Sequence, residues 1–373
     1  MQQIGWSVHP MTLKIILPVG ISFYTFQTMS YTFDVYFRKM KACCQFIDYM
    51  AYVSFFPQLV AGPIERATHF LPQFLNDRRF DHDRAVDGCR QMLWGFFKKI
   101  AIADTLAGFA DPIFTDVSAS SGPELFFATI AFAFQIYCDF SAYSDIATGT
   151  TRLFGFELMR IVTEFSRRWH ISLSTWFRDY VYIPLGGSRN GKARLIGNVL
   201  LTFAISGLWH GASWNFLIWG LIMGFGIVAD VLWSSHSHQT VREVPGGETA
   251  LPTKTALLRM LGTFAIICVG WVFFRSPTFE AATQVLWKSM TGLVTDFAGW
   301  GDLFRKFSHR DGRNVIPMLL LLLVVEWARR RDPHPLMFRD APQWQRWALY
   351  TVMFWGTLYI GPSDNSPFIY FQF

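Results

Sequence analysis

The chain has 373 residues, of which 51% are apolar and only 16% carry a charge. A soluble domain needs about 25% charged residues to cover its surface, so this composition excludes a water-soluble protein and predicts that lipid covers part of the molecule. The net charge of +6 fits a membrane protein with basic cytoplasmic loops. Because no long Lys/Arg block is present, we expect no nucleic-acid binding.

Apolar segments long enough to cross a bilayer, about 17–25 residues, recur along the chain. We predict an all-α polytopic membrane protein with a single membrane-embedded domain over residues 1–373. The candidate spans are residues 12–33, 47–63, 86–107, 123–148, 195–213, 214–233, 256–275, 315–328 and 344–361. Prolines interrupt 47–63, and Lys98 and Lys99 lie within 86–107, so short, broken or re-entrant helices are expected there.

The connection over residues 150–194 holds eight basic and three acidic residues, which predicts a cytoplasmic position. Within it, residues 167–180 (RRWHISLSTWFRDY) mix Arg with Trp, Phe and Tyr, side chains that prefer the headgroup zone. We therefore predict an interfacial or re-entrant helix that ends at residues 182–187 (YIPLGG), where Pro and paired Gly break it. Residues 234–255 are expected to form an exposed loop.

Several common site types have no support in this sequence. The five cysteines show no CxxC and no Cys/His ligand spacing, so we expect buried apolar thiols rather than a metal site or disulfides. No HExxH, P-loop, GxGxxG or GxSxG pattern is present, which argues against zinc proteolysis, nucleotide hydrolysis, dinucleotide binding and a hydrolase triad.

One histidine stands out within an apolar run. His210 is the only basic residue after the start of residues 195–233, and it lies roughly 22 Å along a helix that begins at Leu195. An ionisable group at membrane depth is a functional-site hypothesis by default, and a neutral imidazole suits a general base. The alternative is a histidine that only bridges helices by hydrogen bonds. On these observations both interpretations stay open.

Other polar residues have simpler interpretations. His170, beside arginines at an interface, is by residue type alone better explained as a solvated or headgroup-contacting side chain. Asp139 and Asp145 lie in the 123–148 span, where a carboxylate costs about 2.5–3.5 kcal/mol at a helix centre. We expect them to pair with Arg152 or another interior arginine.

Four segments carry a resemblance to a known family: residues 57–66 (PQLVAGPIER), 137–147 (YCDFSAYSDIA), 167–187 and 206–215 (SGLWHGASWN). With these motifs the chain resembles the membrane-bound O-acyltransferase family, most closely its alginate O-acetyltransferase branch. The resemblance implies a helical ring around a transmembrane tunnel. It also implies further spans ahead of residues 15–20, so we expect the chain to lack N-terminal spans.

The resemblance also implies site residues. His210 matches the family's catalytic histidine, and His170 matches its second histidine on the cytoplasmic side. The neighbouring polar and aromatic residues are expected to bind substrate, and among them Arg178 and Tyr180 would position the donor. The full set is Trp209, Asn215, Trp176, Arg178, Asp179 and Tyr180.

The implied function is transfer of an acetyl group from a cytoplasmic thioester to hydroxyls of an exported polysaccharide such as alginate. Acetyl-CoA would be the co-substrate, with no bound cofactor and no metal. Transfer would be direct or through a periplasmic acetyltransferase subunit. The implied location is the bacterial inner membrane, with multiple passes and lipid contact. Two alternatives stay open: a transporter or channel, and an inactive scaffold for a periplasmic acetyltransferase.

Overall fold

The computed structural model describes residues 20–60, 62–158, 171–236, 252–309, 312–338, 341–361 and 368. Every regular element in these ranges is helical. In chain order they are α1 (Ile21–Tyr36), α2 (Phe46–Val53), η2 (Phe56–Gln58), α3 (Ala67–Leu75), α4 (His82–Phe96), η3 (Phe97–Ala103), α5 (Asp104–Thr115), α6 (Gly122–Leu153), α8 (Ile171–Phe177), η4 (Arg178–Tyr182), α9 (Lys192–His210), α10 (Trp214–His236), α11 (Lys254–Arg275), α12 (Phe279–Thr295), α13 (Phe297–Ser308), α14 (Val315–Ala328) and α15 (Gln343–Ile360).

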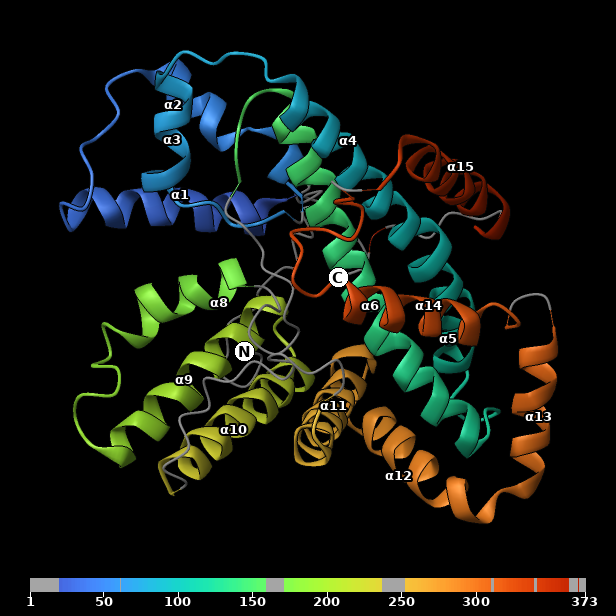
Figure 1. Ribbon diagram of the computed structural model, residues 1–373. Coiled ribbons are helices and arrows are strands. Elements are labelled where there is room, and N and C mark those ends of the chain that lie inside the picture. The colour runs from blue at the N-terminus through green and yellow to red at the C-terminus, as the bar shows by residue number, and fades with distance from the viewer. Residues whose placement is uncertain are drawn as a thin grey trace, which may run out of the picture.

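The longest helix, α6, runs through the middle of the molecule and organises the others around it (Figure 1). It starts with a capping box, in which Ser121 and Glu124 satisfy each other's backbone amides. Helices α4, α5, α11, α12 and α13 all contact it. Because neighbours cover α6 on several sides, it buries polar as well as apolar residues along its length.

Three described helices are long and apolar enough to cross a bilayer: α6, residues Trp214–Leu232 of α10, and α11. They coincide with the predicted spans 123–148, 214–233 and 256–275, which confirms an all-helical membrane protein. The predicted spans 195–213 and 344–361 fall on α9 and α15, which are helical but less apolar. Helix α14 is apolar but has only 14 residues.

The contacts of α9, α10 and α11 show which of their ends lie together. Asn215 at the start of α10 is hydrogen-bonded to Ser276 at the end of α11, and α9 packs against α10 as an antiparallel hairpin. His210, at the end of α9, therefore lies at the same end as the start of α10 and the end of α11. The loop after η4 leads into the start of α9 at the opposite end of this hairpin, where Asn198 donates to the carbonyl oxygens of Leu185 and Gly187.

The two weakest predicted spans have different outcomes. Residues 47–63 are broken, as expected, into the eight-residue α2 and the short η2. Residues 86–107, in contrast, are helical without a break from α4 to α5. Between those helices lies η3, a widened turn with i→i+5 hydrogen bonds, a rare form that is frequent at functional sites.

The widened turn explains the two carboxylates of α6. Lys98 Nζ lies 2.6 Å from Asp145, and Lys99 Nζ lies 2.9 Å from Asp139 and 2.7 Å from Asp104. Among the described residues both carboxylates thus pair with lysine, and the expected partner Arg152 pairs with Asp87 instead. Two lysines next to each other on η3 reach α6 where Arg152, two turns further along the helix, does not.

The cysteine expectation holds only in part. All five thiols are free, and Cys138 on α6 is buried. Cys44 and Cys89 are exposed, so the expectation that they are buried was wrong. Both lie on outward-facing positions of their segments, where neighbouring helices do not cover them.

The buried ion pairs make a stability prediction. Replacing Lys99 with Leu would remove the cation that pairs with Asp104 and Asp139, and breaking a buried pair from one side costs about 3–5 kcal/mol. We expect Lys99→Leu to lower the thermal unfolding midpoint of the detergent-purified protein markedly. Arg84→Leu is the matched control, because Arg84 forms only an exposed pair with Asp81. Equal midpoints for the two variants would contradict the role of the pairs.

Candidate functional site

The hairpin of α9 and α10 positions His210. Gly207 on α9 and Gly220 on α10 face each other where the helices cross, and a Cβ on Gly207 would overlap the Phe216 carbonyl oxygen. A Cβ on Gly220 would likewise overlap the carbonyl oxygen of Phe203. Glycine at both positions lets the two backbones approach closely, as in other packed membrane helices. The close crossing sets the position of His210 three residues further along α9.

His210 is the last residue of α9, and aromatic rings surround its imidazole. The ring centroids of Trp209, Trp219 and Phe274 lie 4.6, 4.9 and 5.3 Å from that of His210, and Phe216 lies 6.5 Å away. These four rings, from α9, α10 and α11, form the His210 box. Packing against flat rings fixes the imidazole without polar partners.

The contacts of His210 bear on its two interpretations. Within the residues that the structure describes, neither ring nitrogen makes a hydrogen bond, and the half-buried ring packs against four aromatic side chains. The described residues therefore give no support to a helix-bridging hydrogen bond. Both nitrogens are left to bind a ligand or exchange a proton, which general-base chemistry requires.

Asn215 supports the box from outside. It is buried, and its side-chain Nδ2 donates a 2.7 Å hydrogen bond to the carbonyl oxygen of Ser276. That bond joins the start of α10, which carries Phe216 and Trp219, to the end of α11, which carries Phe274. The side-chain amide nitrogen of Asn215 thus already donates to Ser276, and a direct contact of Asn215 with substrate stays a prediction.

The other predicted substrate residues lie on α8 and η4. Trp176 is buried, and its indole Nε1 donates to the carbonyl oxygen of Phe26 at 3.1 Å. The Tyr180 hydroxyl donates to Asp34 at 2.8 Å. Asp179 accepts from Arg66 at 3.0 Å and from Arg178 at 2.8 Å. These residues therefore form one polar and aromatic cluster with α1 and the segment after η2.

One residue that the sequence analysis missed connects this cluster to the box. Phe26 on α1 stacks on Trp209 at a centroid distance of 5.0 Å and packs on Trp176 at 4.2 Å. Trp176 in turn contacts Tyr180 at 5.1 Å. A continuous aromatic series thus runs from His210 through Trp209, Phe26 and Trp176 to Tyr180. The predicted site residues on α8, η4 and α9 belong to this one series and its surroundings.

The second predicted histidine, His170, lies outside the residues that the structure describes. Its role stays a prediction. Arg66 is a further residue that the sequence analysis did not assign, although it ends the motif at residues 57–66. Among the described residues, no group of His, Cys, Asp and Glu is arranged to hold a metal ion.

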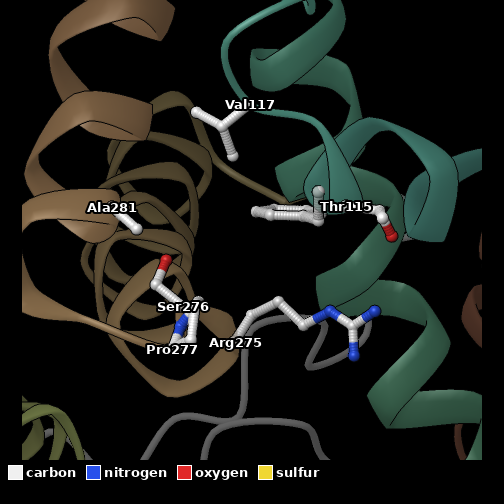
Figure 2. Close-up of a pocket in the computed structure, with 7 residues that line it drawn as sticks. Thr115, Val117, Arg275, Ser276, Pro277 and Ala281 are labelled. Atoms are coloured by element: carbon white, nitrogen blue, oxygen red, sulfur yellow. The ribbon is translucent and has the colours of Figure 1, made fainter.

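A pocket of about 170 Å³ lies beside the box, at the corner between α11 and α12 (Figure 2). Figure 2 shows Arg275 extending from α11 toward α5, where it donates to Asp111 at 2.8 Å. Ser276 lines the pocket and also accepts the hydrogen bond of Asn215. The lining residues are Phe114, Thr115, Val117, Arg275, Ser276, Pro277 and Ala281.

Comparisons with known proteins agree with these features. Residues 41–242 match the model of the membrane-bound O-acyltransferase family. The "Probable alginate O-acetylase AlgI" of Pseudomonas putida is 34% identical over 99% of this chain and 78% of its own length. Its namesake from Pseudomonas aeruginosa is 39% identical over 86% of this chain and 60% of its own length. The "Peptidoglycan O-acetyltransferase" of Helicobacter pylori is 32% identical over 99% of this chain and 77% of its own length.

The helix crossing can be tested with two glycines of α9. In Gly207→Leu the side chain would overlap the Phe216 carbonyl and force α9 away from α10, so we expect a lower thermal midpoint and loss of activity. Gly197→Leu is the matched control, because a Cβ at Gly197 meets no atom within 4 Å. Wild-type activity in Gly207→Leu would show that the close crossing is not needed to place His210.

Proposed function

Because the chain belongs to the membrane-bound O-acyltransferase family, we propose that it moves an acetyl group from a cytoplasmic thioester to a hydroxyl on an exported polysaccharide. The O-acyltransferase class expected from the sequence is confirmed by the family match and by the names of the relatives. The donor, acceptor and partner that follow are parts of the proposal.

One observation carries the proposed mechanism: the His210 imidazole is held by aromatic rings while its nitrogens have no hydrogen-bond partner among the described residues. A histidine serves as a general base when its proton-accepting nitrogen is open to the substrate. Rigid packing on α10 and α11 keeps the ring in one orientation, so little reorganisation accompanies proton transfer.

The proposed reaction is a direct acyl transfer. His210 takes the proton of the acceptor hydroxyl as its oxygen attacks the thioester carbonyl carbon. A new C–O bond forms, the C–S bond breaks, and the leaving thiolate takes the proton back from the imidazolium. The net products are an O-acetyl ester and a free thiol, and His210 returns to its neutral form.

We propose that donor and acceptor reach His210 from opposite sides of the membrane. Residues 150–194, with eight basic and three acidic residues, are proposed to face the cytoplasm. Tyr180 on η4 and His210 at the end of α9 are joined by the ring contacts of Trp176, Phe26 and Trp209. The aromatic series between them is the proposed path of the acyl-bearing arm. The pocket at Arg275 lies at the His210 end, and we assign it to the acceptor side.

We propose acetyl-CoA as the co-substrate, with no bound cofactor. The relatives' names support an exported polysaccharide as acceptor: alginate in the Pseudomonas proteins and peptidoglycan in the Helicobacter protein. Transfer to that polymer is direct or passes through a periplasmic acetyltransferase subunit. This arrangement requires a multi-pass position in the bacterial inner membrane.

The base is tested by His210→Gln, which keeps polar bulk but cannot accept a proton near neutral pH. We expect acetyl transfer to fall by about 10²–10⁴-fold, the usual loss when a general base is removed. Expression and thermal midpoint should stay near wild type. His82→Gln, at an exposed position at the start of α4, is the matched control. Acetylation at the wild-type rate in His210→Gln would remove this residue from the mechanism.

The same variant separates the enzyme from the alternatives. A transporter or channel would show solute or proton flux that needs no acyl donor, whereas the enzyme consumes acetyl-CoA only when an acceptor is supplied. A scaffold would show neither, yet would still support acetylation after His210→Gln. Donor-independent flux that persists in His210→Gln would favour the channel.

Topology is tested by cysteine labelling in a background that lacks the exposed Cys44 and Cys89. A cysteine at Ser188, in the 150–194 connection, should resist an impermeant thiol reagent in intact cells and react in inverted vesicles. A cysteine at Ala119, exposed in the turn between α5 and α6, should behave in the opposite way. Labelling of the Ser188 position from outside would reverse the proposed direction of transfer.

A further inference from the structure

Three cations gather around Tyr180 and its neighbour Asp179. Arg66 follows η2, Lys39 follows α1, and Arg178 begins η4. With the carboxylates of Asp34 and Asp179 they form what we call the Arg66 cluster. Segments more than 100 residues apart in the chain build it, as the Arg66–Asp179 pair shows.

Arg66 is the most enclosed of the three cations, with only 11% of its side chain exposed. Its Nη2 donates to Asp179 at 3.0 Å, and its guanidinium carbon lies 4.6 Å from the centre of the Tyr180 ring. Its Nη1 is buried and has no hydrogen-bond partner in the described part of the chain. A buried charged donor without an acceptor is costly, so this nitrogen indicates a missing anionic partner.

The two carboxylates of the cluster contact other groups and do not supply that partner. Asp179 already binds Arg66 through one oxygen and Arg178 through the other. A single oxygen of Asp34, Oδ1, lies 2.8 Å from the Tyr180 hydroxyl and 3.4 Å from Lys39. Three cations therefore face two carboxylates, an excess of one positive charge. Arg178 and Lys39 are largely exposed, so an incoming anion can reach the cluster from solvent.

We propose that the Arg66 cluster binds a phosphate group of the thioester donor. A guanidinium presents several N–H donors in a planar fork that matches phosphate oxygens, and Lys adds a point charge. This inference rests on the proposed function, because it assigns the phosphate to the donor. The cluster holds the phosphate-bearing end of the donor, and the thioester arm extends along Trp176, Phe26 and Trp209 toward His210.

The test compares two donors that carry the same thioester arm. Acetyl-CoA carries phosphates, whereas S-acetyl-pantetheine carries none. In neutral detergent, we expect Arg66→Gln to raise the KM for acetyl-CoA about tenfold, as fits the loss of a charge-assisted hydrogen bond. The KM for S-acetyl-pantetheine should not change. Arg66→Lys, which keeps the charge but loses the fork, should raise the KM for acetyl-CoA by a smaller factor.

Two controls separate phosphate binding from general damage. Arg84→Gln makes the same change at an exposed arginine and should leave both KM values at wild type. Asp179→Asn removes the ion-pair partner of Arg66 but keeps the guanidinium, so the preference for acetyl-CoA should persist. Equal rises in KM for both donors in Arg66→Gln, or no rise for either, would overturn the proposal.

A direct binding measurement keeps this inference separate from the proposed reaction. Coenzyme A binding to the purified protein needs no turnover, and it should weaken about tenfold in Arg66→Gln. If the wild type transfers no acetyl group yet shows this difference, the reaction fails and the phosphate site stands. Repeating the measurement in nanodiscs with phosphatidylglycerol tests a lipid source. Coenzyme A binding equal in wild type and Arg66→Gln, with lipid binding lost in the variant, would overturn the donor assignment.

Discussion

The molecule depends on a charge balance inside α6. In a central helix that other helices surround, Asp139 and Asp145 are largely withdrawn from water, and Lys98 and Lys99 neutralise them. The widened turn η3 presents these two neighbouring lysines to α6. Helices α4, α5 and α11 pack against α6 in turn, and α11 carries Phe274 of the His210 box.

These lysine–carboxylate pairs also explain why the sequence predicted a broken span where the structure has a continuous helix. A hydropathy pattern counts each charge singly, so Lys98 and Lys99 made residues 86–107 look like a broken span. In the folded protein each lysine is matched to a carboxylate, and the helix is continuous. The spans on α6, α10 and α11 were predictable because their apolar runs carry few charges. An arginine partner for the carboxylates was expected because Arg152 is near in sequence, and nothing in the sequence indicates that η3 is near in space.

The candidate site likewise contains residues that the sequence predicts and residues that it does not. His210 could be predicted, because one ionisable side chain in a long apolar run is conspicuous in any sequence. Phe26 could not, because it is one of 38 phenylalanines and its contacts with Trp176 and Trp209 join residues about 150 or more positions apart. The unpartnered Nη1 of Arg66 could not be predicted either. It depends on the folded contacts of Asp179, which accepts from Arg66 through one oxygen and from Arg178 through the other.

Trp209 and His210 are consecutive residues, yet they face different surroundings: Trp209 stacks on α1, and His210 packs against α10 and α11. Neighbours on an α-helix differ by about 100° in direction. The last turn of α9 therefore separates the proposed donor path, at Trp209, from the proposed base, at His210, by a single residue. It follows that the rotational phase of α9 matters more than its length. A single residue inserted ahead of Trp209 would turn the indole away from Phe26 while leaving the helix intact.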